Sequence, residues 1–383
     1  MTYIPYGKQL LDKKDLKSVL NSLSQDLITT GPLVSKFENE LSNYLKCKYS
    51  YVCSSGTSAL HLAMLSVGLK KNDVILMPAV NFIASYNIAI TMNLKVYLVD
   101  VDKFTGQVTP EKILECIKKN KLKKINAIIL MYNGGYPENV EKFYEIKKKY
   151  NFIIIEDACH ALGAEYKYKK SFIKVGSCKH ADVSTFSLHP IKTITSGEGG
   201  IVTTNNYKIS KNISLFRNHG ILRDKKKYWQ YDILKNGFNY RISDINCALG
   251  LSQLKKIDFF LKNRNEVYKK YLKEFKNFDQ KLLFPNYSKD IKPSFHLFII
   301  NILFKRLGKK KDDFMKYLIN NKIISQQHYI PIYKFSVYKG KKSSFPGSEQ
   351  YYKNSVSIPI YVSLKNRSQK KIINLIKKYI KKS

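Results

Sequence analysis

The chain has 383 residues, 44% of them hydrophobic, which is enough to bury one large core and a smaller second one. Its formal net charge is +38, but the lysines are spread along the whole sequence in runs typical of solvated helix faces. This distribution argues against a nucleic-acid-binding protein. No apolar run is long enough to span a membrane, and the first residues lack the apolar core of a signal peptide. We therefore expect a cytoplasmic protein with no membrane partner.

The cysteines predict free thiols rather than disulfides or a metal site. They are scattered, with no C-x-x-C pair, and Cys178 with His180 lacks the two further ligands that a zinc site needs. The six positions are Cys47, Cys53, Cys116, Cys159, Cys178 and Cys247. Free thiols are consistent with a reducing compartment.

Short apolar runs alternate with amphipathic stretches over the first 250 residues. Helices are expected at 12–24, 58–69, 109–120 and 139–150, and Thr109 and Pro110 are suitable cap and first residues for the third. The runs that predict buried strands are 72–80, 94–102, 125–133, 152–158, 182–188 and 200–205. This alternation predicts an α/β domain with a mostly parallel sheet that helices cover on both faces.

The pattern changes after residue 250. Residues 251–275 predict one long amphipathic helix, and further short strands and helices follow, with a last helix near 368–381. We therefore expect a large α/β domain at 12–250 and a small α+β domain at 251–383. The N-terminal segment 1–24 is expected to pack against the small domain.

One lysine stands apart from all the others. In the stretch STFSLHPIKTITSGEGGIVTTNN, residues 184–206, Lys192 follows a buried strand and has no charged neighbour until Glu198. In open α/β sheets, ligands bind at the ends of strands. A lysine in apolar surroundings at such a place can lose its proton and form a Schiff base with a carbonyl compound. The plain alternative is an ordinary surface lysine in a loop.

Three further signals follow other strand ends or open a helix. Asp157 could hold the ring nitrogen of pyridoxal phosphate, which the cofactor needs in order to act as an electron sink. Gly56 and Thr57 begin a helix, whose first N–H groups suit a phosphate. Phe82 could stack on the ring. Each signal is weak alone, but together with Lys192 they predict a pyridoxal phosphate site.

Seven segments occur in a specific order along the chain: TTGPLVSKFENEL, SGTSALHLA, EDACHALGA, FSLHPIKTITSGEGG, FRNHGI, GFNYRISDINCALGLSQL and QQHYIPIY. In this order the chain resembles, nearly end to end, the sugar aminotransferases of the DegT/DnrJ/EryC1/StrS family. The resemblance implies the fold type I architecture of aspartate aminotransferase and pyridoxal 5′-phosphate as cofactor. It also implies the transamination of a nucleotide-linked keto sugar.

The resemblance implies roles for individual residues. Lys192 would be the lysine that binds the cofactor, Asp157 the partner of its pyridine nitrogen, and His160 the neighbour of its phenolic oxygen. The phosphate would be bound by Gly56, Thr57, Ser187 and, from the other subunit of a homodimer, Asn239. The active sites of the dimer would then be shared between its subunits.

Within the family, the chain most resembles the members that act in pseudaminic acid synthesis. Those enzymes aminate a UDP-linked 4-keto-6-deoxy-N-acetyl sugar, with L-glutamate as amino donor. The residues that would line the substrate are Tyr6, Asp26, Leu27, Ile28, Thr29, Gln326, Gln327, His328 and Tyr329. Aminotransferases of the perosamine and legionaminic or bacillosamine pathways are alternatives. A catalytically silent sugar-nucleotide-binding relative is a further one, against which the presence of Lys192 argues.

Overall fold

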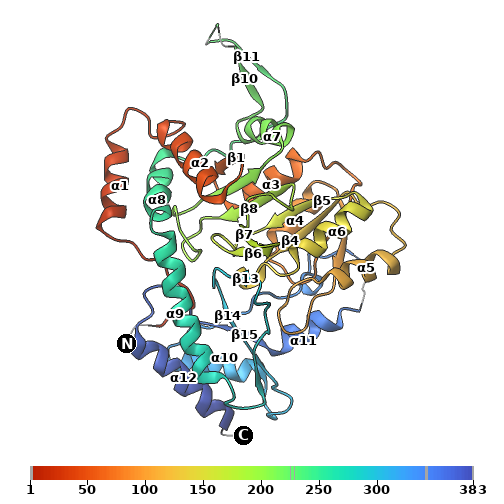
Figure 1. Ribbon diagram of the computed structural model, residues 1–383, viewed down its shortest axis with the longest axis vertical. Helices are drawn as coiled ribbons and strands as arrows, with labels where there is room; N and C mark the ends of the chain where they lie inside the picture. Colours follow the sequence, from red (N-terminus) through yellow and green to blue (C-terminus); the bar gives the residue numbers. More distant parts are fainter. Residues whose placement is uncertain (1–2, 225, 228, 341–343, 382–383) are drawn as a thin grey trace.

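The computed structural model describes residues 3–224, 226–227, 229–340 and 344–381 (Figure 1). Its centre is a seven-stranded sheet in the order β1-β9-β8-β5-β4-β2-β3. The strands are β1 (Tyr49–Cys53), β2 (Val74–Pro78), β3 (Lys95–Val99), β4 (Ala127–Met131), β5 (Ile153–Asp157), β8 (Val183–Ser187) and β9 (Gly200–Thr204). The run from β8 to β3 is parallel, whereas β9 is antiparallel to both of its neighbours. The prediction of a mostly parallel sheet is confirmed.

Helices cover both faces of this sheet. Buried side chains of α3, α4 and α7 pack on one face, and those of α2, α5, α6 and α8 pack on the other. The helices are α2 (Pro32–Leu45), α3 (Gly56–Ser66), α4 (Ala84–Thr91), α5 (Pro110–Lys119), α6 (Val140–Tyr150), α7 (Tyr207–Arg217) and α8 (Asp244–Leu254). As predicted, Pro110 opens α5, and the Thr109 side chain caps it by accepting from the Lys112 N–H at 3.4 Å.

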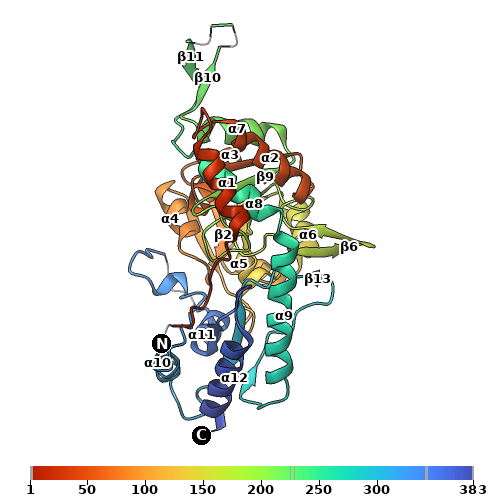
Figure 2. The same cartoon turned by 90° about the vertical axis from the view of Figure 1, so that its left-hand side faces the viewer.

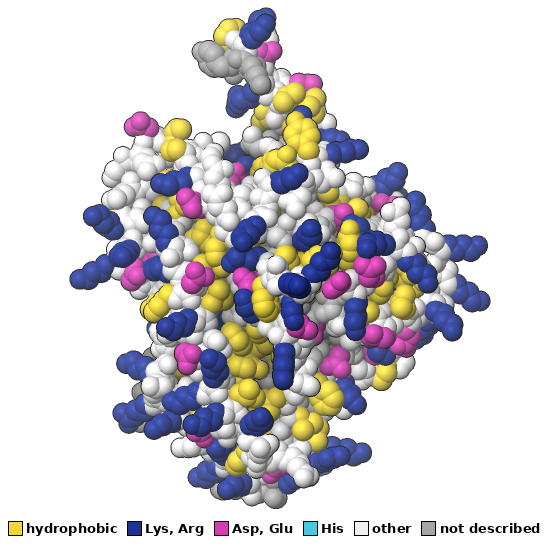
Figure 3. All heavy atoms as spheres, in the orientation of Figure 1, with side chains coloured by type: hydrophobic (Ala, Val, Ile, Leu, Met, Phe, Trp, Pro, Cys, Tyr) yellow, Lys and Arg dark blue, Asp and Glu magenta, His cyan; other side chains and the backbone are white. Residues whose placement is uncertain are grey.

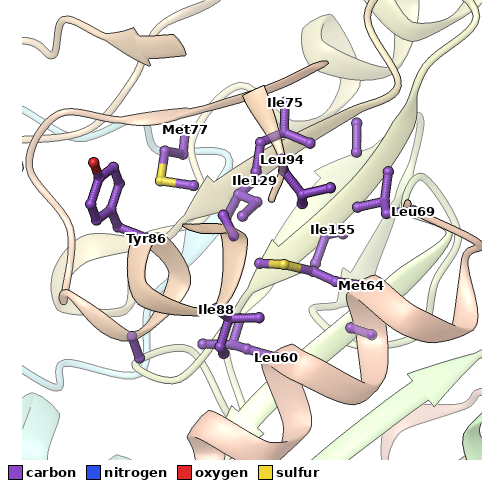
Figure 4. Packing of buried hydrophobic residues seen from close by; sticks show 14 of the residues in the cluster. Leu60, Met64, Leu69, Ile75, Met77, Tyr86, Ile88, Leu94, Ile129 and Ile155 are labelled. Atoms are coloured by element: carbon purple, nitrogen blue, oxygen red, sulfur yellow. The ribbon is translucent and has the colours of Figure 1, made fainter. Parts of the chain in front are cut away.

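The central strands read as continuous apolar runs because each side of the sheet is buried. Side chains alternate between the two faces of a strand. Ile75 and Ile129 therefore join the cluster under α3 and α4, and the adjacent Leu76 and Ile128 join the cluster under α5 and α6. Figure 4 shows the first of these clusters, in which Leu60 and its neighbours in α3 meet the strands. A parallel sheet of this kind gives no alternation of apolar and polar residues.

The predicted single helix at 251–275 is wrong. Helix α8 ends at Leu254, and a separate α9 (Ile257–Phe275) begins after a break. At the break Lys256 leaves helical geometry, and its Nζ lies 2.9 Å from an oxygen of Asp12 and 2.6 Å from one of Asp15. The apolar period continues across the break, so the local sequence gives no sign of it, and Lys256 contacts the distant N-terminal segment at this point.

The C-terminal part forms a second, smaller α+β layer beside α9 (Figure 1). Its three-stranded sheet has the order β12-β14-β15, and its core includes the buried side chains of α9 and α12. The elements are β12 (Leu282–Leu283), β14 (Phe298–Ile302), α10 (Lys311–Asn320), the 3₁₀ helix Ile332–Lys334, α11 (Pro346–Asn354), β15 (Ser355–Ile358) and α12 (Asn366–Lys381). The domain boundary at 250/251 stays a prediction, and α9 runs alongside both parts of the molecule.

Two smaller sheets complete the fold. One joins β6 (Glu165–Tyr168) and β7 (Ser171–Lys174) to β13 (Ile291–Lys292). The other is the hairpin of β10 (Ile221–Arg223) and β11 (Tyr231–Ile233), which projects from the body of the molecule near α7 (Figures 1 and 2). A short 3₁₀ turn, Asn133–Gly135, follows β4.

The N-terminal segment packs only partly where it was expected. Residues ahead of the first helix do contact the C-terminal part, since Ile4 pairs with Ile323. Helix α1 (Lys13–Leu23) instead packs on α8, where the Ser18 hydroxyl donates to the Ala248 carbonyl at 2.8 Å. The buried carboxylate of Asp15 anchors the helix there by accepting hydrogen bonds from the side chains of α8.

The excess positive charge is not gathered into one patch on the face that Figure 3 shows. Lysine and arginine side chains are distributed across it, over both parts of the chain. The helices of the described residues include none with the length and apolarity needed to cross a bilayer.

We expect Ile129→Ala in β4 to lower the free energy of unfolding by about 2 to 5 kcal/mol, because the side chain is 1% exposed and its loss leaves a cavity between two packed layers. Leu114→Ala is the matched control, since Leu114 is 39% exposed on α5 and its loss should cost at most about 0.5 kcal/mol. Urea unfolding of both variants checks this expectation. Equal destabilisation by the two would contradict the assigned core.

Candidate active site

A cavity of about 380 Å³ opens at the carboxyl ends of the parallel strands. Most of the predicted site residues line it, although they come from widely separated parts of the sequence. These are Tyr6, Gly56, Thr57, Phe82, Asp157, His160, Ser187, Lys192, His328 and Tyr329. The fold therefore brings together the lysine, the carboxylate and the helix start that the sequence suggested.

Lys192 lies in the turn after β8, where its N–H donates to the His189 carbonyl at 2.9 Å. Its side chain is half-buried in the cavity wall. Burial lowers the pKa of the Lys192 amine, and the nearby Cys159 and Asp157 partly offset this effect. The positive charge of Arg264 acts in the same direction as burial. The surroundings thus favour a neutral amine, which is the form that can act as a nucleophile or a base.

Asp157 ends β5 and is 3% exposed. One of its oxygens accepts from the Ser85 hydroxyl at 3.2 Å, and the other accepts from the Cys159 N–H at 3.4 Å. Burial raises the pKa of the Asp157 carboxyl, against the effect of these donors and of Lys192. A buried carboxyl with two long hydrogen bonds can readily accept another from a cationic N–H in the cavity.

The N-terminus of α3 provides donors for an anion. Ser55 caps the helix by accepting from the Ser58 N–H at 3.1 Å, and Gly56 and Thr57 occupy its first turn at the cavity wall. N–H groups in a first helical turn have no partner within the helix. Ser187 comes so near that a Cβ at Gly56 would lie 2.8 Å from the Ser187 Cβ. Only glycine allows this approach without displacement of Ser187.

Two hydrogen bonds connect Gly134, His160 and Tyr329 in series, and both run in the same direction. The Gly134 N–H donates to His160 Nδ1 at 3.2 Å, so the proton of a neutral ring is on Nε2. His160 Nε2 then donates to the Tyr329 hydroxyl oxygen, 2.9 Å away. Burial lowers the pKa of His160 far below its usual range and raises that of Tyr329 far above. Tyr329 therefore keeps its proton and can donate it to a group in the cavity.

Three further contacts describe predicted cofactor and substrate residues near the cavity. The Phe82 ring is 52% exposed, with its centroid 5.7 Å from that of Tyr329. The Tyr6 ring centroid lies 5.4 Å from that of His328. His328 Nδ1 lies 2.9 Å from the Ser357 hydroxyl oxygen, and burial lowers the pKa of His328 to about 3. His328 is thus a neutral ring at any physiological pH.

Other predicted residues do not line this cavity within one chain. Asn239 pairs with Asn218 through the main chain, and Leu27 and Ile28 in the predicted stretch Asp26–Thr29 are 55% and 46% exposed. Gln326 pairs with Ser357 through the main chain, and the Gln327 side chain accepts from Lys311 Nζ at 2.6 Å. Neither glutamine is among the residues that line the cavity.

The sequence interpretation missed residues that only the fold brings to the site. His296 lines the cavity, with its ring centroid 4.2 Å from that of His160. Neither ring nitrogen of His296 has a hydrogen-bond partner among the described residues. Glu198 and Cys159 also line the cavity. A lone histidine before an apolar strand carries no sequence signal, whereas Cys159 stands two positions from Asp157.

A metal centre has no support in the described residues, where no group of three or more histidine, cysteine, aspartate or glutamate side chains could hold an ion.

The chain matches the DegT/DnrJ/EryC1/StrS aminotransferase family over residues 9–377, and it belongs to that family. The enzymes of this family use pyridoxal phosphate as cofactor. The family expectation from the sequence, its fold type and its enzyme class are confirmed.

Individual relatives show which members of the family the chain is similar to. A UDP-4-amino-4,6-dideoxy-N-acetyl-beta-L-altrosamine transaminase of Campylobacter jejuni serotype O:23/36 is 37% identical over 96% of this chain and 95% of its own. A GDP-perosamine synthase of Escherichia coli O157:H7 is 30% identical over 96% of this chain and 95% of its own. Among solved structures, the Helicobacter pylori aminotransferase PseC, involved in the biosynthesis of pseudoaminic acid, superposes with a TM-score of 0.90 at 28% identity, and all of both chains is covered.

We expect Gly56→Ala to weaken binding of the cofactor about tenfold, or ~1.4 kcal/mol, because the new Cβ would displace Ser187 at the helix start. Titration of the apoenzyme with pyridoxal phosphate, followed by absorbance, measures the affinity. Two further variants, Ser187→Gly and the double variant Gly56→Ala/Ser187→Gly, distinguish the steric effect of the new Cβ from the loss of the Ser187 hydroxyl. Unchanged affinity in Gly56→Ala would contradict the assigned phosphate site.

Proposed function

We propose that the chain transfers an amino group from L-glutamate to C4 of a UDP-linked keto sugar in pseudaminic acid biosynthesis. The substrate would be UDP-2-acetamido-2,6-dideoxy-β-L-arabino-hexos-4-ulose, and the product UDP-4-amino-4,6-dideoxy-N-acetyl-β-L-altrosamine. The full-length similarity to the C. jejuni transaminase supports this substrate. The observation that carries the chemistry is the presence of Lys192 and Asp157 in one cavity beside the start of α3.

The residues of the cavity fit pyridoxal phosphate. The buried Asp157 carboxyl would hold the protonated ring nitrogen, and the first turn of α3 with Thr57 and Ser187 would hold the phosphate. Phe82 would stack on the ring, and His160 would lie by the phenolic oxygen. When bound, the cofactor supplies an electron sink that stabilises negative charge at the α-carbon of the amino donor.

Lys192 is the group we assign to proton transfer. Its amine has a lowered pKa in the cavity, so at neutral pH a larger fraction of it is unprotonated than in water. A neutral amine can take a proton from the α-carbon of glutamate. The amine would give that proton up to the bound cofactor to complete the first half-reaction, and in the second it would take a proton back and deliver it to C4 of the sugar. Both half-reactions therefore use the same side chain, and its amine must stay within reach of both carbon atoms in the cavity.

The Tyr329 hydroxyl is suited to hold an oxygen of the substrate or cofactor. It accepts from His160 and keeps its own proton, because burial raises its pKa. A donor held in place by two earlier hydrogen bonds needs little reorganisation when a ligand arrives. Tyr6 and His328 would add contacts to the sugar from the same side of the cavity.

We propose further that the enzyme is a homodimer with shared sites. Asn239 and the stretch Asp26–Thr29 are not among the residues that line the cavity of their own chain, and the apolar side chains of Leu27 and Ile28 are exposed. Contribution of these residues to the partner's cavity would cover the exposed apolar side chains and complete the phosphate site. A cytoplasmic location fits the cysteines, which form no disulfide in the described residues.

The similarity to the E. coli GDP-perosamine synthase makes another nucleotide-sugar 4-aminotransferase the second candidate. Incubation with L-glutamate and a panel of UDP- and GDP-linked 4-keto-6-deoxy sugars, with product analysis by NMR, distinguishes the two. We expect amination at C4 of the UDP-linked N-acetyl sugar. Amination of GDP-linked sugars alone would overturn the proposed substrate and leave the enzyme class intact.

Lys192→Ala should abolish turnover and remove the borohydride-stable adduct between enzyme and cofactor, because no other lysine of the described residues lines the cavity. Peptide mapping by mass spectrometry after borohydride reduction locates the adduct in the wild type. Lys256→Ala, at the break between α8 and α9, is a control that should keep the adduct. An adduct that persists at another lysine in the Lys192→Ala variant would refute the central assignment, and an inactive wild type without any adduct would favour the silent relative.

The shared site can be tested with mixed dimers. Asn239→Asp should weaken cofactor binding, because a carboxylate would stand beside the phosphate, and like charges repel strongly in a partly buried site. A dimer of one Asn239→Asp chain and one Lys192→Ala chain has one site with an intact lysine and an intact asparagine. Activity should therefore recover when the two variants are mixed. If heterodimers form and activity does not recover, each chain uses its own Asn239 or none.

A further inference from the structure

A buried arginine lies behind the lysine of the site. Arg264, on α9, is 2% exposed and is among the largest fully buried side chains of the protein. Within the described residues no carboxylate pairs with it, and its Nε has no hydrogen-bond partner. Burial lowers the pKa of Arg264 to about 10, which still leaves the guanidinium charged at neutral pH. A buried cation without a counterion is costly to stability, so its presence calls for an explanation.

The guanidinium is held by main-chain carbonyl groups of separate segments. Its Nη2 donates to the carbonyls of Ile191 at 3.2 Å and Lys192 at 3.5 Å. Its Nη1 faces three more carbonyl oxygens at 3.3 to 3.5 Å, those of Phe295, His296 and Ile360. One side chain of α9 thus ties the turn that carries Lys192 to the two segments that flank the small sheet.

We propose that Arg264 is a positioning residue for Lys192, which fixes the backbone of the turn that carries it and places a permanent positive charge behind its amine. The inference rests on the proposed role of Lys192 in the reaction. It assigns to Arg264 no contact with substrate or cofactor, since Arg264 does not line the cavity. A methionine of similar length could fill the same space, so packing alone does not require a guanidinium there.

The charge matters because the other groups around Lys192 act differently on its protonation. Asp157 and Cys159 favour the protonated amine, whereas Arg264 opposes it. Three imidazoles also face the site, and burial lowers the pKa of each, so they are neutral at physiological pH. They are His160, His296 and His328. Arg264 is therefore a charge that stays fixed while pH changes through the physiological range.

The inference is tested on the apoenzyme by competitive acetylation with acetic anhydride over a range of pH. The extent of labelling at the Lys192 peptide, read by mass spectrometry, reports the pKa of that amine without any turnover. Arg264→Met should raise the pKa of Lys192, because a nearby like charge is lost. At a pH below both pKa values, labelling of Lys192 should then fall severalfold.

Two matched variants separate charge from packing. Arg264→Lys keeps the positive charge with fewer donors, so the pKa of Lys192 should stay near that of the wild type. Loss of the planar fork should slow the capture of pyridoxal phosphate by the apoenzyme. Lys262→Met removes an exposed charge from the same helix and should leave both quantities unchanged.

A purely structural arginine gives a different result. If Arg264→Met is folded by circular dichroism and its Lys192 labels with the pH profile of the wild type, the proposal is overturned. An equal shift in Lys262→Met would overturn it as well. Where Arg264→Met does not fold, Arg264→Gln is measured in its place. Failure of both neutral variants to fold, while Arg264→Lys folds, would assign Arg264 to stability alone. If the pKa of Lys192 does not change in Arg264→Met, the borohydride adduct at Lys192 is still expected to form. The proposed function would therefore stand.

Discussion

Asp157 is buried at the end of β5 and Lys192 is half-buried in the turn after the neighbouring β8, and burial moves the pKa of each toward its uncharged form. Such a pair holds its position only on a rigid support. The seven-stranded sheet provides it, because helices bury both of its faces and every strand that carries a site residue is packed from two sides. The sheet therefore supports both the carboxylate and the turn that carries the lysine.

Much of this arrangement could be predicted from the sequence, since its strongest signals are local. Buried strands read as apolar runs, and the runs that precede Asp157 and Lys192 are enough to place both residues at strand ends. The break at Lys256 could not be predicted, because it depends on carboxylates more than 240 positions away in the chain. The positions of Arg264 and His296 at the site could not be predicted for the same reason. Their surroundings come from segments that only the folded chain brings together.

Long-range contacts of this kind also explain how the C-terminal part takes part in the site. Tyr329, His328 and His296 belong to segments of that part, yet they line the cavity beside residues of the central sheet. Helix α9 connects the small sheet to the site, since it contributes to the core of that sheet and its Arg264 contacts the turn of Lys192. A displacement of the C-terminal part would therefore change the shape of the substrate side of the cavity and the backbone of the lysine turn together.

The direction of the hydrogen bonds from Gly134 through His160 to Tyr329 has a consequence for selectivity. Because the Tyr329 oxygen already accepts one hydrogen bond, the hydroxyl faces the cavity chiefly as a donor. A ketone oxygen can accept from it, but an ammonium group, which can only donate, cannot. At that point the wall of the cavity therefore favours a ligand group that accepts a hydrogen bond over one that can only donate, and this preference depends on polarity rather than on shape.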